Sequence, residues 1–169
     1  ITICTNDRDM CQLIDDDVKI YFCDLKVYVD SSNFSSYFCY HKDNSLLIKT
    51  MKGDDSDSIK GVKGLGKDTL IKLFPEIKDR GLTLTEIIAK AKTLQEERKT
   101  NKLKPLAVLN NIINGTTDGV QGDSLYEINN KLINLKEPLL TQDGINDLEL
   151  LINGVLGGDR SIKNVFIKL

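Results

Sequence analysis

The sequence lacks the features that mark membrane-spanning and secreted proteins. It contains no run of about 18 or more apolar residues, so a transmembrane helix is not expected. Its first residues show no basic start followed by a long apolar segment, and a signal peptide is not expected either. We therefore predict a cytoplasmic protein without a membrane partner.

The cysteines lack the pairing that a structural zinc site needs. No Cys-x-x-Cys pair occurs among Cys4, Cys11, Cys23 and Cys39, although His41 lies two residues after Cys39. A zinc site is therefore disfavoured, and we predict reduced thiols that are mostly buried.

The charges are unevenly distributed along the chain. The 169 residues are 40% hydrophobic and 28% charged, which suits one globular domain or two small subdomains. The net charge of −2 conceals an acidic segment, 1–57, with eleven acidic and six basic side chains, and a basic segment, 60–104, with twelve basic and six acidic side chains. This division suits a metal-using enzyme that holds a polyanion, although a solvated charged helix would also explain the basic segment.

The first third of the sequence alternates predicted strands and short helices. Ile1–Thr5 is β-branched and alternating, which predicts a buried strand. The aromatic side chains of Phe34, Tyr37 and Phe38 recur at helical spacing and are predicted to lie in the core. Further strands are expected at 18–22 and 25–29, and helices at 9–14, from residue 30 and at 45–52.

The remaining sequence is predicted to be mainly helical. Thr83 and Glu86 form a capping box that opens a long helix, and Asn114-Gly115 breaks a later one. The segments expected are a helix at 69–74 that stops at Pro75, helices at 106–113, 126–132 and 145–152, an extended segment at 135–140 and a final segment at 162–169.

Two carboxylates follow the first predicted strand. Residues separated by one position point the same way along a strand, so Asp7 and Asp9 can converge on one ligand at its carboxyl end. In open α/β sheets, ligands bind at that end. The alternative is that either aspartate caps the N-terminus of the helix that follows. Both interpretations stay open at this point.

The stretch 51–67 places carboxylates directly before a glycine-rich basic turn. Asp54 and Asp57 lie three residues apart, and their oxygens could hold a divalent cation such as magnesium. Glycine permits positive φ and close backbone approach, and a helix beginning after the turn would direct its free amides at an anion. The glycines are Gly61, Gly64 and Gly66.

Two strings resemble the bacterial and phage 5′→3′ exonuclease family, which includes flap endonucleases, phage ribonuclease H enzymes and the exonuclease domains of bacterial DNA polymerase I. Thr5–Leu13 is similar to the family's strand-end Asp-x-Asp. Gly53–Gly66 is similar to its Gly-Asp-x-x-Asp and the helix-three-turn-helix motif that follows. The order and the spacing both match. The tail, with Leu135–Leu140, looks more like the phage ribonuclease H branch, for which the location would be the host cytoplasm.

The resemblance implies an α/β fold in two parts. Residues 1–57 would be the carboxyl-terminal part of a PIN-like or Rossmann-like nuclease sheet, and residues 58–169 a mainly helical helix-three-turn-helix DNA-binding subdomain with a tail. The implied activity is a magnesium-dependent 5′→3′ exonuclease or flap nuclease that hydrolyses phosphodiester bonds in DNA flaps or RNA primers during replication. The implied partner is a DNA or RNA/DNA duplex with a 5′ end or flap.

The resemblance also implies roles for individual residues. The second of two metal ions, Mg²⁺ or Mn²⁺, would be held by Asp7, Asp9, Asp54 and Asp57. The glycine turn would hold duplex phosphates through its backbone amides, with a potassium ion on its carbonyls. The residues of this nucleic-acid site would be Gly61, Lys63, Gly64, Gly66 and Lys67.

The family's first metal site and its basic arch lie upstream of the Asp-x-Asp strand, and the sequence begins at Ile1 without them. An upstream segment or a partner polypeptide is expected to complete the nuclease domain, pairing with an exposed edge at Ile1–Thr5. The chain alone is therefore expected to cleave little. The alternative function is a non-catalytic helix-hairpin-helix DNA-binding module, in which the carboxylates only cap turns.

Overall fold

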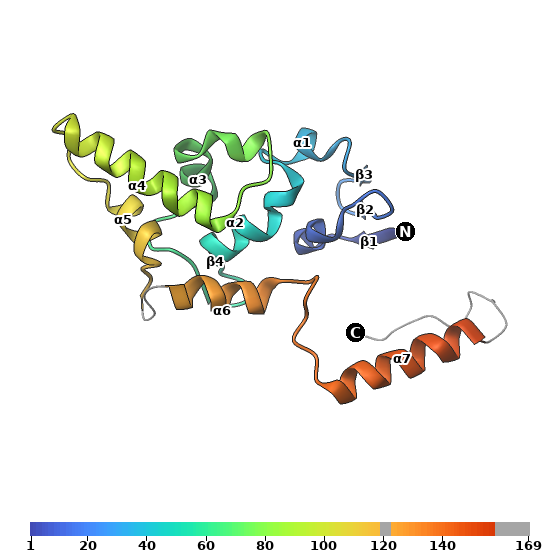
Figure 1. The fold of residues 1–169 in the computed structure, drawn as a ribbon. Helices are drawn as coiled ribbons and strands as arrows, with labels where there is room; N and C mark the ends of the chain where they lie inside the picture. Colours follow the sequence, from blue (N-terminus) through green and yellow to red (C-terminus); the bar gives the residue numbers. More distant parts are fainter. Residues whose placement is uncertain (119–122, 158–169) are drawn as a thin grey trace. The chain divides into compact units, whose positions relative to one another are not determined.

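The computed structural model describes residues 1–118 and 123–157, which form a mixed α/β structure of two small sheets and mostly helices (Figure 1). The chain divides into two units, Ile1–Pro138 and Leu139–Leu169. The first unit contains both sheets and every predicted site residue. No helix within the described ranges is long and apolar enough to cross a membrane.

The first sheet has three strands. β1 (Thr2–Thr5) pairs in parallel with β2 (Lys19–Phe22), which pairs antiparallel with β3 (Val27–Val29). β1 therefore lies at an edge, and its residues are exposed or half-buried. The prediction of a strand is right, but the prediction that it is buried is wrong, because β1 has a neighbour on one side only among the described strands. The predicted helix at 9–14 is a 3-10 helix, η1 (Arg8–Leu13).

A small core covers this sheet. It contains Cys11, Ile14, Ile20, Phe22, Val29, Phe34 and Phe38. The rings of Phe34 and Phe38 stack with centroids 4.4 Å apart at the short helix α1 (Phe34–Tyr37). The core prediction is therefore right for these two rings. It is wrong for Tyr37, which is 44% exposed because it lies on the outer face of α1.

The four cysteines are free thiols. Cys11 is buried in the small core, whereas Cys4, Cys23 and Cys39 are exposed. The prediction that the thiols are mostly buried is therefore wrong, because Cys4 lies on the edge strand β1 and Cys23 and Cys39 lie in an exposed turn and an exposed bend.

The second core is built around α2 (Ser45–Lys52), whose bounds agree with the predicted helix. α2 packs against α3 (Lys67–Leu73) and α6 (Asp123–Ile133), while α4 (Leu84–Thr100) packs against α5 (Ala107–Asn114). Two 3-10 helices, η2 (Lys42–Asn44) and η3 (Pro75–Lys78), complete the unit. The fully or nearly fully buried side chains of this core include Met51, Leu70, Phe74, Ile77, Ile87, Ala91, Leu109 and Ile112.

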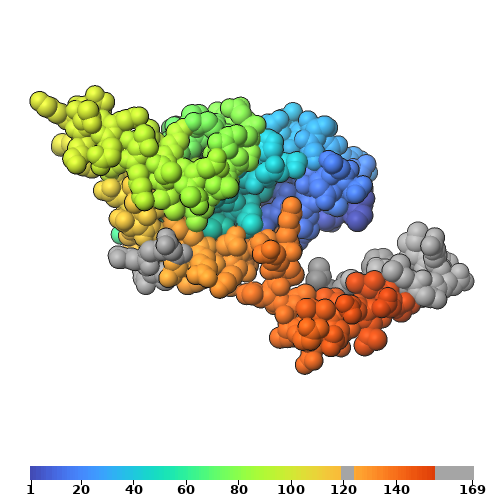
Figure 2. Space-filling view, in the orientation of Figure 1, coloured from blue at the N-terminus to red at the C-terminus, as the bar shows by residue number. Residues whose placement is uncertain are grey.

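Local signals at the helix ends agree with the structure. The Thr83 hydroxyl oxygen accepts the Glu86 backbone N–H at 3.2 Å, and the Glu86 carboxylate accepts the Thr83 N–H at 2.7 Å, which confirms the capping box. Gly115 ends α5 with φ of 55°. α4 runs on to Thr100 as an exposed charged helix, and Figure 2 shows it on the surface.

The tail is only partly as predicted. The segment 135–140 contains a turn and irregular backbone instead of an extended strand, since no other strand lies beside it among the described elements. α7 (Gln142–Gly157), in the second unit, contains the predicted helix at 145–152. The predicted segment at 162–169 lies outside the described residues.

Candidate metal and nucleic-acid site

A glycine-dependent hairpin follows α2. β4 (Gly53–Asp54) pairs antiparallel with β5 (Ile59–Lys60), and Gly53 ends α2 with φ of 77°. A Cβ atom on Gly53 would lie 2.4 Å from the Ile59 carbonyl oxygen, and one on Gly61 would lie 1.9 Å from the Lys52 carbonyl oxygen. Only glycine fits these two positions, because the backbone passes too close for any side chain. The hairpin presents Asp54 and Asp57 on one tight loop.

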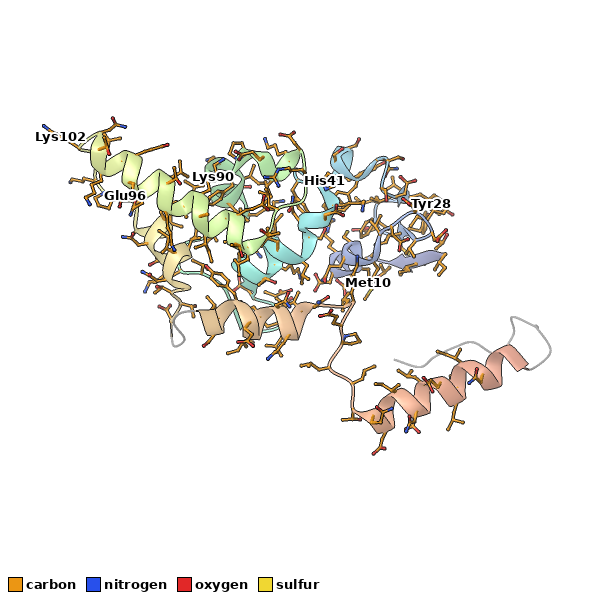
Figure 3. All side chains as sticks on the ribbon, in the orientation of Figure 1. Met10, Tyr28, His41, Lys90, Glu96 and Lys102 are labelled. Carbon is orange, nitrogen blue, oxygen red and sulfur yellow. The ribbon has the colours of Figure 1, made fainter. Side chains whose placement is uncertain are left out.

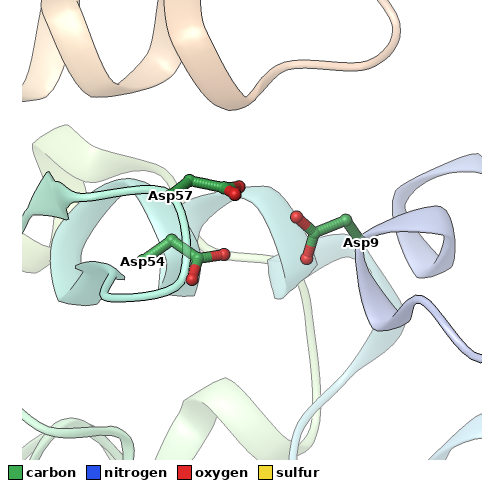
Figure 4. Close-up of side chains that lie close together, drawn as sticks. All are labelled: Asp9, Asp54 and Asp57. Carbon is green, nitrogen blue, oxygen red and sulfur yellow. The ribbon is translucent and has the colours of Figure 1, made fainter.

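The hairpin brings its carboxylates to η1. Asp9, Asp54 and Asp57 each place a carboxylate oxygen within 4.8 Å of the others (Figure 4), and we call these three residues the aspartate cluster. Asp9 comes from η1, Asp54 from β4 and Asp57 from the loop before β5. Segments far apart in the sequence therefore bring three of the four predicted ligands together, while their role as metal ligands stays a prediction.

Asp7 lies outside the aspartate cluster. Its carboxylate accepts the Asp9 backbone N–H at 2.8 Å, which makes it the N-cap of η1. The capping alternative is thus what the structure shows for Asp7. Its role as a metal ligand stays a prediction, while the cap itself fixes the direction in which Asp9 leaves the backbone.

Lys49, which the sequence analysis missed, lies between two members of the cluster. Its ammonium group forms ion pairs with Asp9 and Asp54, and its side chain is 26% exposed. Desolvation lowers the pKa of Lys49, but the hydrogen bonds and charges of Asp54 and Asp9 outweigh it and raise the pKa above its ordinary value. The available signal was a lysine in the last turn of α2, five residues before Asp54.

Asp54 is the most constrained of the three carboxylates. Its Oδ1 atom accepts the Ser56 hydroxyl at 2.5 Å and the Ser56 N–H at 3.0 Å. The hydrogen bond from Lys49, followed by those from Ser56, lowers the pKa of Asp54 to about 2. Asp54 is therefore an anion at neutral pH, in the state that a metal ligand requires.

The aspartate cluster fits a divalent cation. Three carboxylates supply hard oxygen ligands, which Mg²⁺ and Mn²⁺ prefer. The Lys49 ammonium already offsets the repulsion between Asp9 and Asp54, so a positive charge is favourable at this point. A cation bound between these two residues would take over the charge that Lys49 now supplies.

The glycine turn after the hairpin is exposed and firmly anchored. Gly64 has φ of 76°, Gly66 caps α3, and neither would meet another atom within 4 Å if it carried a Cβ. The Lys63 N–H donates to the Thr116 carbonyl at 2.8 Å, and the Lys63 side chain pairs with Asp118 at 2.9 Å. The turn therefore offers open backbone to a ligand while the segment after α5 holds it in place.

The predicted nucleic-acid residues have two different surroundings. Lys63, Gly64, Gly66 and Lys67 are exposed. Gly61 is half-buried, and its small size serves the packing of the hairpin on Lys52. Lys67 also lines a cleft of about 320 Å³ that it shares with Asp9 and Lys49. One cleft thus connects the aspartate cluster to the start of α3.

A buried asparagine on α6 ties together two elements next to the site. The Asn129 amide donates to the Thr50 carbonyl at 2.9 Å and the Lys60 carbonyl at 2.8 Å, which ties α6 to α2 and β5. Asn129 is 2% exposed. α6 therefore supports the site without contributing a predicted site residue.

Comparison with known proteins finds relatives for part of the chain. No protein-family model matches the chain. A 5′-3′ exonuclease of Bacillus subtilis is 37% identical over 82 residues, which are 45% of this chain and 27% of that protein. A 5′-3′ exonuclease of Mycoplasmopsis pulmonis is 33% identical over 97 residues, which are 54% of this chain and 33% of that protein.

The chain is thus related to nucleases. Within that class, its relationship is with the 5′-3′ exonuclease family, over about half of its own length. The matched region spans a third or less of each curated relative.

Proposed function

We propose that this chain supplies part of a magnesium-dependent 5′→3′ exonuclease or flap nuclease, acting on DNA flaps or RNA primers. The observation that carries the proposal is the aspartate cluster, since Asp9 meets Asp54 and Asp57 in a chain related to 5′-3′ exonucleases. Carboxylate clusters of this kind hold divalent metals in phosphodiester hydrolysis.

Each part of the site has a proposed task. The aspartate cluster, with Asp7, holds the second metal ion, which when bound stabilises negative charge on the phosphate during in-line displacement. Asp7 sets the position of Asp9 through the cap on η1. Lys49 keeps the carboxylates ionised and close together before the metal enters.

The helical part of the first unit is proposed to hold the duplex. Residues 61–67 present exposed backbone amides and the cations Lys63 and Lys67 to phosphates, with a potassium ion on the carbonyls of the turn. Together with α3 they would form the helix-three-turn-helix motif. The duplex-binding part is proposed to begin at residue 58, after the metal-site part, 1–57.

An upstream segment or a partner polypeptide is proposed to complete the nuclease. β1 supports this, because its outer edge has no partner strand among the described residues and exposed edges favour strand addition. The first metal site would come from that segment. The complete enzyme is proposed to act in the cytoplasm.

A non-catalytic DNA-binding module is the second candidate, favoured by one observation. Lys49 forms ion pairs with both Asp9 and Asp54, so these carboxylates could serve to bind α2 to η1 and to β4. Such a module would hold duplex backbones without needing a divalent cation.

Cleavage of a 5′-flap substrate separates the two candidates. With Mg²⁺, the 169-residue chain is expected to bind the flap substrate and to cleave it little. Adding the upstream segment is expected to produce cleavage that Asp54→Asn removes, with Asp55→Asn as the matched control. Cleavage that persists in Asp54→Asn would refute the catalytic proposal.

A further inference from the structure

The cleft beside the aspartate cluster combines cationic and aromatic side chains. Its volume of about 320 Å³ lies at the small end of the range for ligand pockets. It is lined by cations and aromatic rings from η1, α2, α3 and the segment around α1. The lining residues that matter here are Arg8, Tyr37, Tyr40, Lys52 and Lys67.

The cations of the cleft are available to an anion. Lys52 and Lys67 are exposed and form no ion pair with any described residue. Arg8 has one long contact with Asp24, at 4.0 Å, and lies 5.7 Å from the centroid of the Phe22 ring. Asp9 also lines the cleft, but it is paired with Lys49, so Arg8, Lys52 and Lys67 leave an excess of positive charge that suits a phosphate group.

The aromatic side of the cleft offers one free ring. Tyr37 is 44% exposed and makes no hydrogen bond or ring contact within the described part of the chain. Tyr40 is held in place, with its ring 5.5 Å from Phe34 and 5.9 Å from Phe38 between centroids. An exposed tyrosine beside unpaired cations has the two elements that bind an unpaired nucleotide, a stacking face and a phosphate contact.

We propose that this cleft binds a single unpaired nucleotide, with its phosphate at Lys52 and Lys67 and its base against Tyr37. The proposal rests on the proposed function, because it takes nucleic acid as the ligand. A larger cavity, of about 480 Å³, does not compete for it. Four aspartates, Asp15, Asp16, Asp17 and Asp30, line that cavity with Lys19 and Ile1, so its carboxylates outnumber its cations and disfavour phosphate.

Titration of the 169-residue chain with AMP, followed by NMR, tests the nucleotide site. AMP is expected to bind at least tenfold more tightly than adenosine or inorganic phosphate, because only AMP meets both walls. Tyr37→Ala is expected to weaken AMP binding by about tenfold, the effect of one base stacking on an aromatic ring. Tyr28→Ala is the matched control, since Tyr28, labelled in Figure 3, is an exposed tyrosine on β3 that does not line the cleft.

A second pair of variants tests the lysines that are proposed to bind the phosphate. Lys67→Ala is expected to weaken AMP binding, while Lys72→Ala, an exposed lysine on the same helix that does not line the cleft, leaves it unchanged. AMP binding that is absent, or that is equal in the wild type, Tyr37→Ala and Lys67→Ala, would overturn the proposal.

Blunt duplex DNA and Mg²⁺, titrated separately, distinguish failure of the nucleotide site from failure of the proposed function. If both bind but AMP does not respond to Tyr37→Ala, only the nucleotide site is rejected. If neither binds while AMP binding depends on Tyr37, the nucleotide site stands and the proposed nuclease function is rejected.

Discussion

The aspartate cluster and the glycine turn adjoin the same cleft, yet the chain builds them in opposite ways. The cluster joins η1 to the β4–β5 hairpin, and it exists only if α2 packs correctly between them. The turn is one continuous stretch, 61–67, whose shape depends on local backbone and a few anchoring hydrogen bonds. Different substitutions should therefore disrupt the structures of the two sites.

Ion pairs stabilise the aspartate cluster, whereas hydrogen bonds to the backbone stabilise the glycine turn. Asp9 and Asp54 are balanced by the Lys49 ammonium, so the cluster should respond to pH and to metal. The turn is fixed by hydrogen bonds from Lys63 to Thr116 and from the Asn111 side chain to Lys63. Its structure should be sensitive to replacement of its glycines, and its binding of a duplex should weaken as the salt concentration rises.

The largest expected effect comes from a substitution at the boundary of the two sites. Gly61→Ala should destabilise the chain by about 4 kcal/mol or more, because the new Cβ would lie 1.9 Å from the Lys52 carbonyl oxygen. Gly66→Ala, at an open position with ordinary φ, should cost less than about 1 kcal/mol. Thermal unfolding measured by circular dichroism compares the two variants, and equal losses would contradict the packing role of Gly61.

The next effect isolates the charge balance of the cluster. Lys49→Met should destabilise the metal-free chain by about 2 kcal/mol, less than for a fully buried pair because Lys49 is partly exposed. Mg²⁺ should then stabilise Lys49→Met more than it stabilises the wild type, since the cation replaces the missing charge. Lys52→Met, an unpaired lysine on α2, is the control. Unfolding with and without Mg²⁺ measures both the loss of stability and the stabilisation by Mg²⁺. Equal stabilisation of Lys49→Met and the wild type by Mg²⁺ would contradict the replacement of the Lys49 charge by the cation.

A smaller effect appears at acid pH. The pKa of Asp54 in the folded chain is about 2, below its ordinary value of 3.8, so its contribution to stability is present above about pH 4 and is lost as pH falls towards 2. Urea unfolding measures the free energy of unfolding at pH 5 and at pH 2.5. The decrease between the two pH values should be about 1–2 kcal/mol smaller in Asp54→Asn than in the wild type. Asp55→Asn, which changes an exposed neighbour, should behave as the wild type does.

The smallest effect concerns the turn. Lys63→Ala should weaken binding of blunt duplex DNA by about 1 kcal/mol and reduce the dependence of log affinity on log salt by about one unit, because one phosphate contact is lost. Asp118→Asn should strengthen binding, since it releases Lys63 from its ion pair. Fluorescence anisotropy at several salt concentrations measures both. Unaltered salt dependence in Lys63→Ala would exclude the contact.

Local signals predicted the parts of the molecule that depend on neighbours in the sequence. α2 follows the apolar spacing of residues 45–52, and the start of α4 follows the Thr83–Glu86 capping box. Asp54 and Asp57 were identified from their three-residue spacing and the motif around them, and the hairpin that carries them depends on the nearby Gly53 and Gly61.

Features that depend on which surfaces meet could not be predicted in this way. The pairing of Lys49 with Asp9 requires η1 and α2 to pack together, and no spacing in the sequence indicates that contact. Tyr37 shares the periodicity of its buried neighbours, yet nothing in the described structure covers it. Asp7 lies between the end of β1 at Thr5 and the start of η1 at Arg8, so its side chain caps η1 instead of converging with Asp9.

The most direct test of the account is a calorimetric titration of Mg²⁺ into the 169-residue chain and two variants. The aspartate cluster should bind one Mg²⁺ ion, Asp54→Asn should weaken that binding by tenfold or more, and Asp55→Asn should leave it unchanged, because only Asp54 belongs to the cluster. Equal Mg²⁺ affinities in all three proteins would contradict the claim that the aspartate cluster is a metal site.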